Sequence, residues 1–171
     1  MGDSPLQGLD ARIARIEATQ VPAQLPTQLR ITPDRDTVIW LDCFRRWRGA
    51  VSFEAHVLQL RPEPALVFDS DVGMKMKEIQ VEETDGAELA WIDVVATVDG
   101  VEAKASRGGV FSGGASGWTG GSWGAFSVLV PDDVSEVLIR LECAAVPLRR
   151  VLELDTDVLR AALDDVWDYS A

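Results

Sequence analysis

The single histidine of the chain, His56, is the residue on which any imidazole-based acid–base chemistry would depend. It follows Ser52 and Glu54 at intervals of two residues, and this period places all three side chains on one face of a strand. A serine, a carboxylate and an imidazole are the residue types of nucleophilic catalysis. Alternating polar residues are also what a solvated sheet face shows. We therefore expect a protein that is not an enzyme, and we assign no catalytic residue.

The two cysteines, Cys43 and Cys143, lie in apolar strand-like runs. A zinc site needs more ligands at a recognisable spacing than these two thiols and His56 supply. Free cysteines in such runs behave as small apolar residues. We expect two buried thiols without a disulfide, no metal and no cofactor.

Two tryptophans, Trp118 and Trp123, occur in the glycine-rich segment 108–124. The segment has neither the Gly-Lys-Ser/Thr of a phosphate-binding loop nor a dinucleotide fingerprint. It is interpreted as a flexible connection between strands. Exposed tryptophans on such a loop would bind a partner or a ligand. In the other interpretation, Trp123 begins the next strand and packs in the core, while Trp118 caps one end of it.

A basic and aromatic cluster, Arg45-Arg46-Trp47-Arg48, interrupts an otherwise acidic sequence. Arginine binds carboxylates and phosphates with two parallel hydrogen bonds and stacks on tryptophan, so the cluster is a candidate site for anion recognition. The alternative is a solvated hairpin tip, with arginines paired to nearby Asp and Glu. Candidate binding residues are thus Arg45, Arg46, Trp47, Arg48, Trp118 and Trp123.

The charge balance restricts the classes of partner. The 171 residues include 16 basic and 28 acidic ones, for a net charge of −12. Nucleic acid and anionic membrane surfaces would be repelled. No apolar run is long enough to span a membrane, and the first residues show no signal peptide, so we expect a cytoplasmic protein. The excess of Arg over Lys suggests a bacterial genome rich in G and C.

The first 30 residues are expected to form a helix and a proline-containing segment. Leu9, Ile13 and Ile16 have helical spacing, and if exposed this stripe would suit self-association or a partner helix. Two prolines in the segment 21–27 indicate a linker or a segment that covers a sheet edge. Residues 31–171 are assigned to the main domain.

The main domain shows the alternation typical of β-strands. Expected strands are 37–41, 51–60, 90–98, 101–105, 125–130, 137–143 and 148–154. Asp99-Gly100 predicts a tight hairpin turn, because a type I′ turn needs two residues with positive φ. Asp155 is the predicted N-cap of a helix over 156–168. Since strands do not alternate with helices, we expect an antiparallel β-sandwich, mostly β, with a short N-terminal helix and a C-terminal helix.

The C-terminal half has a sequence of features that can be compared with a known family. These features are the glycine-rich stretch ending at Trp123, the strands before Pro131 and Cys143, the Val-Leu-Glu-Leu-Asp of 151–155, and the helix ending in Trp167. In these features the chain resembles an uncharacterised actinobacterial β-sandwich protein family, over about half its length. The family's aromatic–proline pattern before the loop is missing. The resemblance implies an all-β fold and a bacterial origin, and no activity.

Two functions remain open from the sequence. The first is a non-catalytic protein-interaction module, such as an adaptor, an assembly component or an inhibitor or immunity protein, with an acidic surface for a basic protein partner. The alternative is a β-sandwich that binds carbohydrate or another small ligand through its loop tryptophans.

Overall fold

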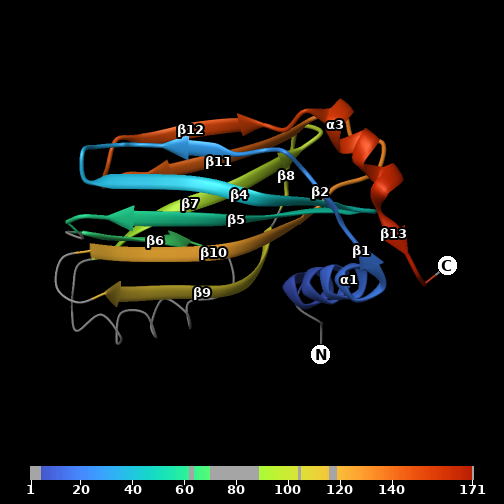
Figure 1. The fold of residues 1–171 in the computed structure, drawn as a ribbon, viewed down its shortest axis with the longest axis horizontal. Coiled ribbons are helices and arrows are strands. Elements are labelled where there is room, and N and C mark those ends of the chain that lie inside the picture. Colours follow the sequence, from blue (N-terminus) through green and yellow to red (C-terminus); the bar gives the residue numbers. More distant parts are fainter. Residues whose placement is uncertain (1–4, 62–63, 70–88, 104, 116–118, 171) are drawn as a thin grey trace.

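The computed structural model describes residues 5–61, 64–69, 89–103, 105–115 and 119–170. In this part of the chain the fold is mostly β, with antiparallel sheets and helices near both ends (Figure 1). The antiparallel β-sandwich expected from the alternation is confirmed. The described helices include none long and apolar enough to cross a membrane.

The larger sheet has six strands in the order β2-β4-β5-β10-β9, with β3 also paired to β4. These strands are β2 (Ala23–Gln24), β3 (Leu29–Ile31), β4 (Thr37–Trp47), β5 (Ala50–Gln59), β9 (Ala105–Ala115) and β10 (Thr119–Leu129). All of their pairings are antiparallel. Because β2 and β3 pair with β4, the proline-containing segment covers a sheet edge, which was one of the two alternatives.

The smaller sheet has five strands in the order β12-β11-β7-β6, with β8 paired to β7. These strands are β6 (Ala65–Asp69), β7 (Leu89–Val98), β8 (Val101–Ala103), β11 (Val137–Cys143) and β12 (Leu148–Glu153). Only β6 runs parallel to its neighbour, β7. The predicted turn joins β7 to β8, where Asp99 and Gly100 have φ of +48° and +76°. Both residues therefore have the positive φ that the sequence predicted.

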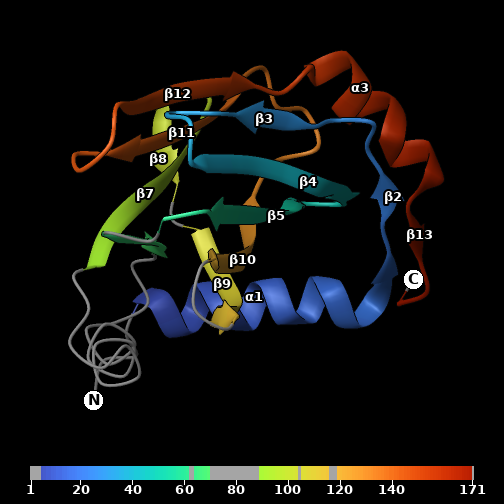
Figure 2. The same ribbon diagram turned by 60° about the vertical axis from the view of Figure 1, so that its left-hand side comes forward.

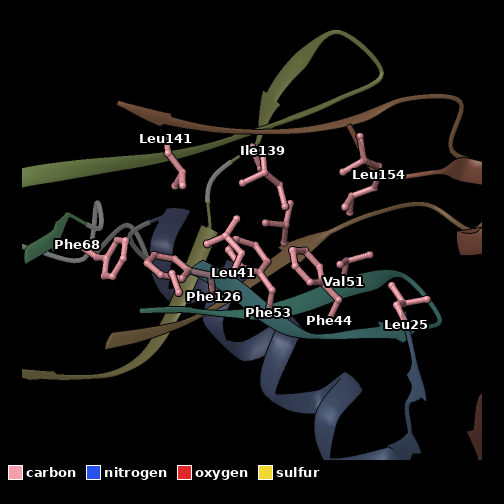
Figure 3. Close-up of a cluster of buried hydrophobic side chains, with 14 of the residues drawn as sticks. Leu25, Leu41, Phe44, Val51, Phe53, Phe68, Phe126, Ile139, Leu141 and Leu154 are labelled. Atoms are coloured by element: carbon pink, nitrogen blue, oxygen red, sulfur yellow. The ribbon is translucent and has the colours of Figure 1, made fainter. Parts of the chain in front are cut away.

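The hydrophobic core lies between the two sheets (Figure 3). The ring of Phe53 stacks on Phe44 and on Phe126, with centroids 5.1 and 5.4 Å apart, and Phe68 meets Phe126 edge-on. From the smaller sheet, Ile139 faces these rings (Figure 3). Full burial of an aromatic or branched side chain contributes roughly 1.5–3 kcal/mol, so this row of phenylalanines is a main source of stability.

Helix α1 (Pro5–Thr19) packs on the outer side of the larger sheet, away from β11 and β12 (Figure 2). Ile13 is buried there against Trp47 and Ala50, and Leu9 and Ile16 pack at the margin of the same cluster. The apolar stripe of the predicted N-terminal helix therefore docks on its own sheet. Only one end of the outer face, beside the β4–β5 turn, is covered in this way.

The C-terminal helix is shorter than expected. Helix α3 (Thr156–Ala161) begins at the predicted N-cap, Asp155, whose side chain accepts hydrogen bonds from the Asp157 and Val158 amides. A 3₁₀ turn, η1 (Ala162–Asp165), follows, and Val166 is extended. Strand β13 (Trp167–Asp168) then pairs with β1 (Gln20–Val21). The prediction of helix up to 168 is wrong, because pairing with β1 draws the last residues out of the helix.

Candidate functional site

The basic cluster of the sequence lies in strand β4 and the β4–β5 turn, and its members have different roles. Arg46 is fully buried. Its Nη1 donates to the carbonyls of Ala50 and Val130, both at 3.1 Å, and its Nη2 donates to the carbonyl of Pro131 at 2.9 Å. Burial lowers the pKa of Arg46, and the nearby carboxylate of Asp132 partly offsets this. These hydrogen bonds connect the β4–β5 turn to residues 130 and 131, which follow β10.

Trp47 is also buried, and its indole Nε1–H donates to the hydroxyl of Ser52 at 3.0 Å. Arg45 is half-buried beside it. Arg48 is exposed in the turn, where it donates to the Leu163 carbonyl at 3.2 Å. The cluster is therefore not a solvated hairpin tip, because the side chains of Arg46 and Trp47 are buried. Arg48 is its exposed member.

The glycine-rich segment is not a flexible connection in its described part. Residues 105–115 and 119–129 form β9 and β10, an antiparallel pair. Trp118 lies outside the described residues. Trp123 belongs to β10 but does not pack in the core, since 36% of it is exposed on the outer face of the sheet. Its neighbour Gly124 is the residue that turns inward at this point.

Trp40, His56 and Trp123 form an aromatic row across the outer face. They are direct cross-strand partners on β4, β5 and β10. The rings of Trp40 and His56 stack with centroids 4.7 Å apart and planes 4° apart. The centroids of His56 and Trp123 lie 6.5 Å apart. Close pairs of this kind stabilise a sheet and hold each ring in one orientation.

The row lies beside exposed aliphatic side chains on the part of the outer face that α1 leaves uncovered. Leu58 and Leu60 are 44% and 48% exposed. Val38, Trp40 and Leu58 line a hollow of about 370 Å³ that Arg30 also borders. We call this surface, made of Val38, Trp40, His56, Leu58, Leu60 and Trp123, the aromatic face.

Two carboxylates hold His56 in place within the aromatic face. Its Nε2 lies 3.0 Å from Oδ1 of Asp42 and 3.5 Å from Oε2 of Glu54. Ionised carboxylates only accept hydrogen bonds, so Nε2 carries the proton in the contact with Asp42. Because Asp42 and Glu54 are direct cross-strand partners, the pairing of β4 with β5 brings these groups together.

Cys43 lies at a β-bulge in β4, where the register with β5 shifts between Asp42 and Arg45. Its φ is +51°, a conformation that side chains rarely adopt. The thiol is exposed, and its sulfur and the carboxylate oxygens of Asp42 and Glu54 all lie within 4.8 Å of one another. Desolvation raises the pKa of the Cys43 thiol, and Glu54 and Asp42 raise it further. The prediction of a buried thiol is wrong for Cys43 and confirmed for Cys143.

Sequence reasoning found His56 and Glu54 on one strand face but missed Trp40, Asp42 and Cys43 as their neighbours. The sequence offered a hairpin tip at the basic cluster, between the strands expected over 37–41 and 51–60, and counting back from that turn was the available signal. That count pairs His56 with Leu41, because the pairs nearest the turn are Trp47–Ala50 and Arg45–Ser52. The extra residue of the bulge shifts the register by one and brings Trp40 opposite His56.

Comparisons with protein-family models, with curated proteins and with solved structures gave no match. The class that the structure itself defines is a mostly antiparallel β-sandwich protein with an aromatic and acidic site on one outer sheet face. The resemblance to an actinobacterial family stays a prediction.

Proposed function

We propose that the chain is a non-catalytic protein-interaction module that binds another protein through its aromatic face. The observation that carries the proposal is the exposure of Trp123 and Leu58, 36% and 44%, on a sheet surface that α1 leaves uncovered. A contiguous patch of large apolar side chains on a protein surface usually marks a contact site, whereas single exposed apolar residues need no such explanation. Tryptophan in particular is enriched among the residues that dominate binding energy.

The chemistry of the aromatic face favours a partner with basic side chains. Asp42 and Glu54 lie beside the aromatic face, in contact with His56, and the whole chain has a net charge of −12. An arginine of the partner would pair with these carboxylates through two parallel hydrogen bonds. Charge of opposite sign would also speed the encounter, and salt would weaken this effect.

The orientation of the rings favours protein binding over the alternative, a carbohydrate platform. A sugar stacks on the open face of an aromatic ring. The planes of Trp40 and His56 are only 4° apart at a centroid distance of 4.7 Å, so each ring covers one face of the other. The stacked pair therefore leaves fewer open ring faces for a sugar, and the exposed side chains of Leu58 and Leu60 beside it suit contact with a protein.

The cellular location and the class of partner are proposed from the sequence. The proposal includes a location in the cytoplasm. A partner other than nucleic acid agrees with the net charge of −12. Self-association through Leu9, Ile13 and Ile16 is not proposed, because this stripe packs on the sheet.

The test is capture of a partner from a lysate of the organism that encodes the chain, in low salt. Three baits are compared: the wild type, Trp123→Ala and Trp167→Ala. Trp167 is 70% exposed on β13, so its replacement removes a more exposed tryptophan at a different place on the surface. A central tryptophan contributes about 2 kcal/mol or more, so Trp123→Ala should weaken binding roughly 30-fold. Trp167→Ala should bind like the wild type.

A photo-crosslinking residue at position 58 then locates the contact, with position 151 as control. Leu58 lies on the aromatic face, whereas Val151 is exposed on β12 in the other sheet. Crosslinks to the captured protein are expected from position 58 only. Retention of nothing by the wild type, or equal retention by Trp123→Ala, would refute the proposal.

A further inference from the structure

Four side chains that can bind a metal ion, Cys43 among them, lie on the adjacent strands β4 and β5. Asp42 and Cys43 come from β4, and Glu54 and His56 come from β5. Consecutive residues of a regular strand point to opposite faces. The bulge at Cys43 breaks this rule, so the thiol lies near both carboxylates instead of turning into the core.

The separations of these groups are close to those of a coordination shell. With zinc–ligand bonds of 2.0–2.3 Å, tetrahedral geometry places ligand atoms about 3.3–3.6 Å apart. The imidazole nitrogen of His56 lies 3.0 Å from Asp42 and 3.5 Å from Glu54. The sulfur of Cys43 and the two carboxylates lie within 4.8 Å of one another. The His56 nitrogen is not part of this group of three, so the side chains of Cys43 and His56 must rotate toward each other to complete the shell.

We propose that Asp42, Cys43, Glu54 and His56 bind a divalent transition-metal ion of the zinc type, with the proton of His56 moved from Nε2 to Nδ1 and the thiol proton of Cys43 released to solvent. A thiolate with an imidazole selects zinc, cobalt or similar ions, whereas calcium and magnesium prefer oxygen ligands alone. The four groups are accessible from solvent, with Cys43 exposed and the side chains of Asp42, Glu54 and His56 22–30% exposed.

The surroundings of the site support this assignment. The ring of Trp40 stacks on His56 and fixes the direction of its Nε2, as outer groups do around known metal ligands. Three of the four groups carry negative charge when they bind a metal, and their mutual repulsion is relieved by a divalent cation.

The experiment titrates the purified, reduced chain with Co²⁺ and records its absorption spectrum. We expect one Co²⁺ per chain and a thiolate-to-cobalt charge-transfer band. Zn²⁺ should displace the cobalt, and a large excess of Mg²⁺ should not, since zinc binds such sites more tightly. Competition with a chelating dye then gives the zinc dissociation constant.

Variants identify the ligands. Cys43→Ser should remove the charge-transfer band and weaken zinc binding on the order of 100-fold or more, because loss of a second-shell partner alone costs 10–100-fold. His56→Gln should weaken zinc binding at least 10-fold. Cys143→Ala, at the buried cysteine of the other sheet, should bind as the wild type does. Circular dichroism checks that each variant is folded.

Absence of the charge-transfer band in the wild type, or its persistence in Cys43→Ser, would overturn the metal site. Unchanged zinc binding by His56→Gln would overturn the four-ligand assignment. The metal titration uses no partner protein, so its outcome is independent of the proposed interaction. If both proposals hold, zinc and a basic side chain of the partner compete for Asp42 and Glu54, and zinc should weaken capture of the partner.

Discussion

Replacement of Arg46 tests whether the buried guanidinium fastens the β4–β5 turn. Arg46→Ala removes three hydrogen bonds to backbone carbonyls, those of Ala50, Val130 and Pro131. The contacts to Ala50 and Val130 are buried, and the contact to Pro131 is half-buried. Each buried carbonyl left without its donor costs about 1–3 kcal/mol, and the lost side-chain volume adds a cavity. The charge that is removed was itself costly to bury, which offsets part of this loss. We expect destabilisation of about 4 kcal/mol.

The assay is urea unfolding followed by tryptophan fluorescence. With a slope of about 2 kcal/mol per molar urea, Arg46→Ala should lower the midpoint by about 2 M and leave the slope unchanged. Arg46→Lys keeps the charge but supplies a single nitrogen, so its midpoint should lie between those of the wild type and Arg46→Ala.

Arg48→Ala is the matched control from the same turn. Arg48 is 45% exposed, and its ion pair with Asp132 has a nitrogen–oxygen distance of 3.8 Å. Arg48 also donates to the Leu163 carbonyl at 3.2 Å. An exposed ion pair contributes about 0–1 kcal/mol and a single hydrogen bond about 0.5–1.5 kcal/mol, so this variant should lose only about 1 kcal/mol. The reasoning is refuted if Arg46→Ala costs less than about 1 kcal/mol, or if Arg48→Ala costs as much as Arg46→Ala.

Three further predictions concern the hairpin turn, the C-terminal helix and the thiols. Asp99→Ala removes the acceptor of the Ser135 and Glu136 amides, at 2.8 and 2.9 Å, and should lower stability by about 1–2 kcal/mol in urea unfolding; an unchanged midpoint would contradict this. Asp155→Ala deletes the cap of α3 and should cost about 1 kcal/mol, whereas Asp155→Asn should cost little. A thiol reagent should modify Cys43 alone in the folded chain and both cysteines in denaturant; because the pKa of Cys43 is raised, the rate should keep rising above the pH at which an ordinary thiol levels off.

The fold class could be predicted because alternation and turn chemistry are local. Residues 51–57 alternate with period two, and one of their faces is buried in the structure. Asp99-Gly100 permits the positive φ of its turn whatever lies around it. Asp155 likewise caps a helix through contacts within three residues. Such signals need no knowledge of distant partners.

The errors arose where a distant partner decided the outcome. The glycine-rich residues have low intrinsic strand propensity, yet β10 is a strand because it pairs with β5 on one side and with β9 on the other. The last residues of the predicted helix leave it because β1 offers them backbone partners. From the sequence, Arg46 was expected at the surface, as most arginines are. Only the tertiary fold brings the carbonyls of Val130 and Pro131 to its guanidinium.

The sequence by itself determined a β-sandwich, its hairpin turn, its helix cap and the polar face of β5, because each depends on neighbours in the chain. Only the tertiary structure decided the site. One extra residue at Cys43 shifts the register of β4, and this shift places Trp40 and Asp42 beside His56. A one-residue shift exchanges the two faces of a strand, so side chains across a bulge cannot be matched by counting from the turn.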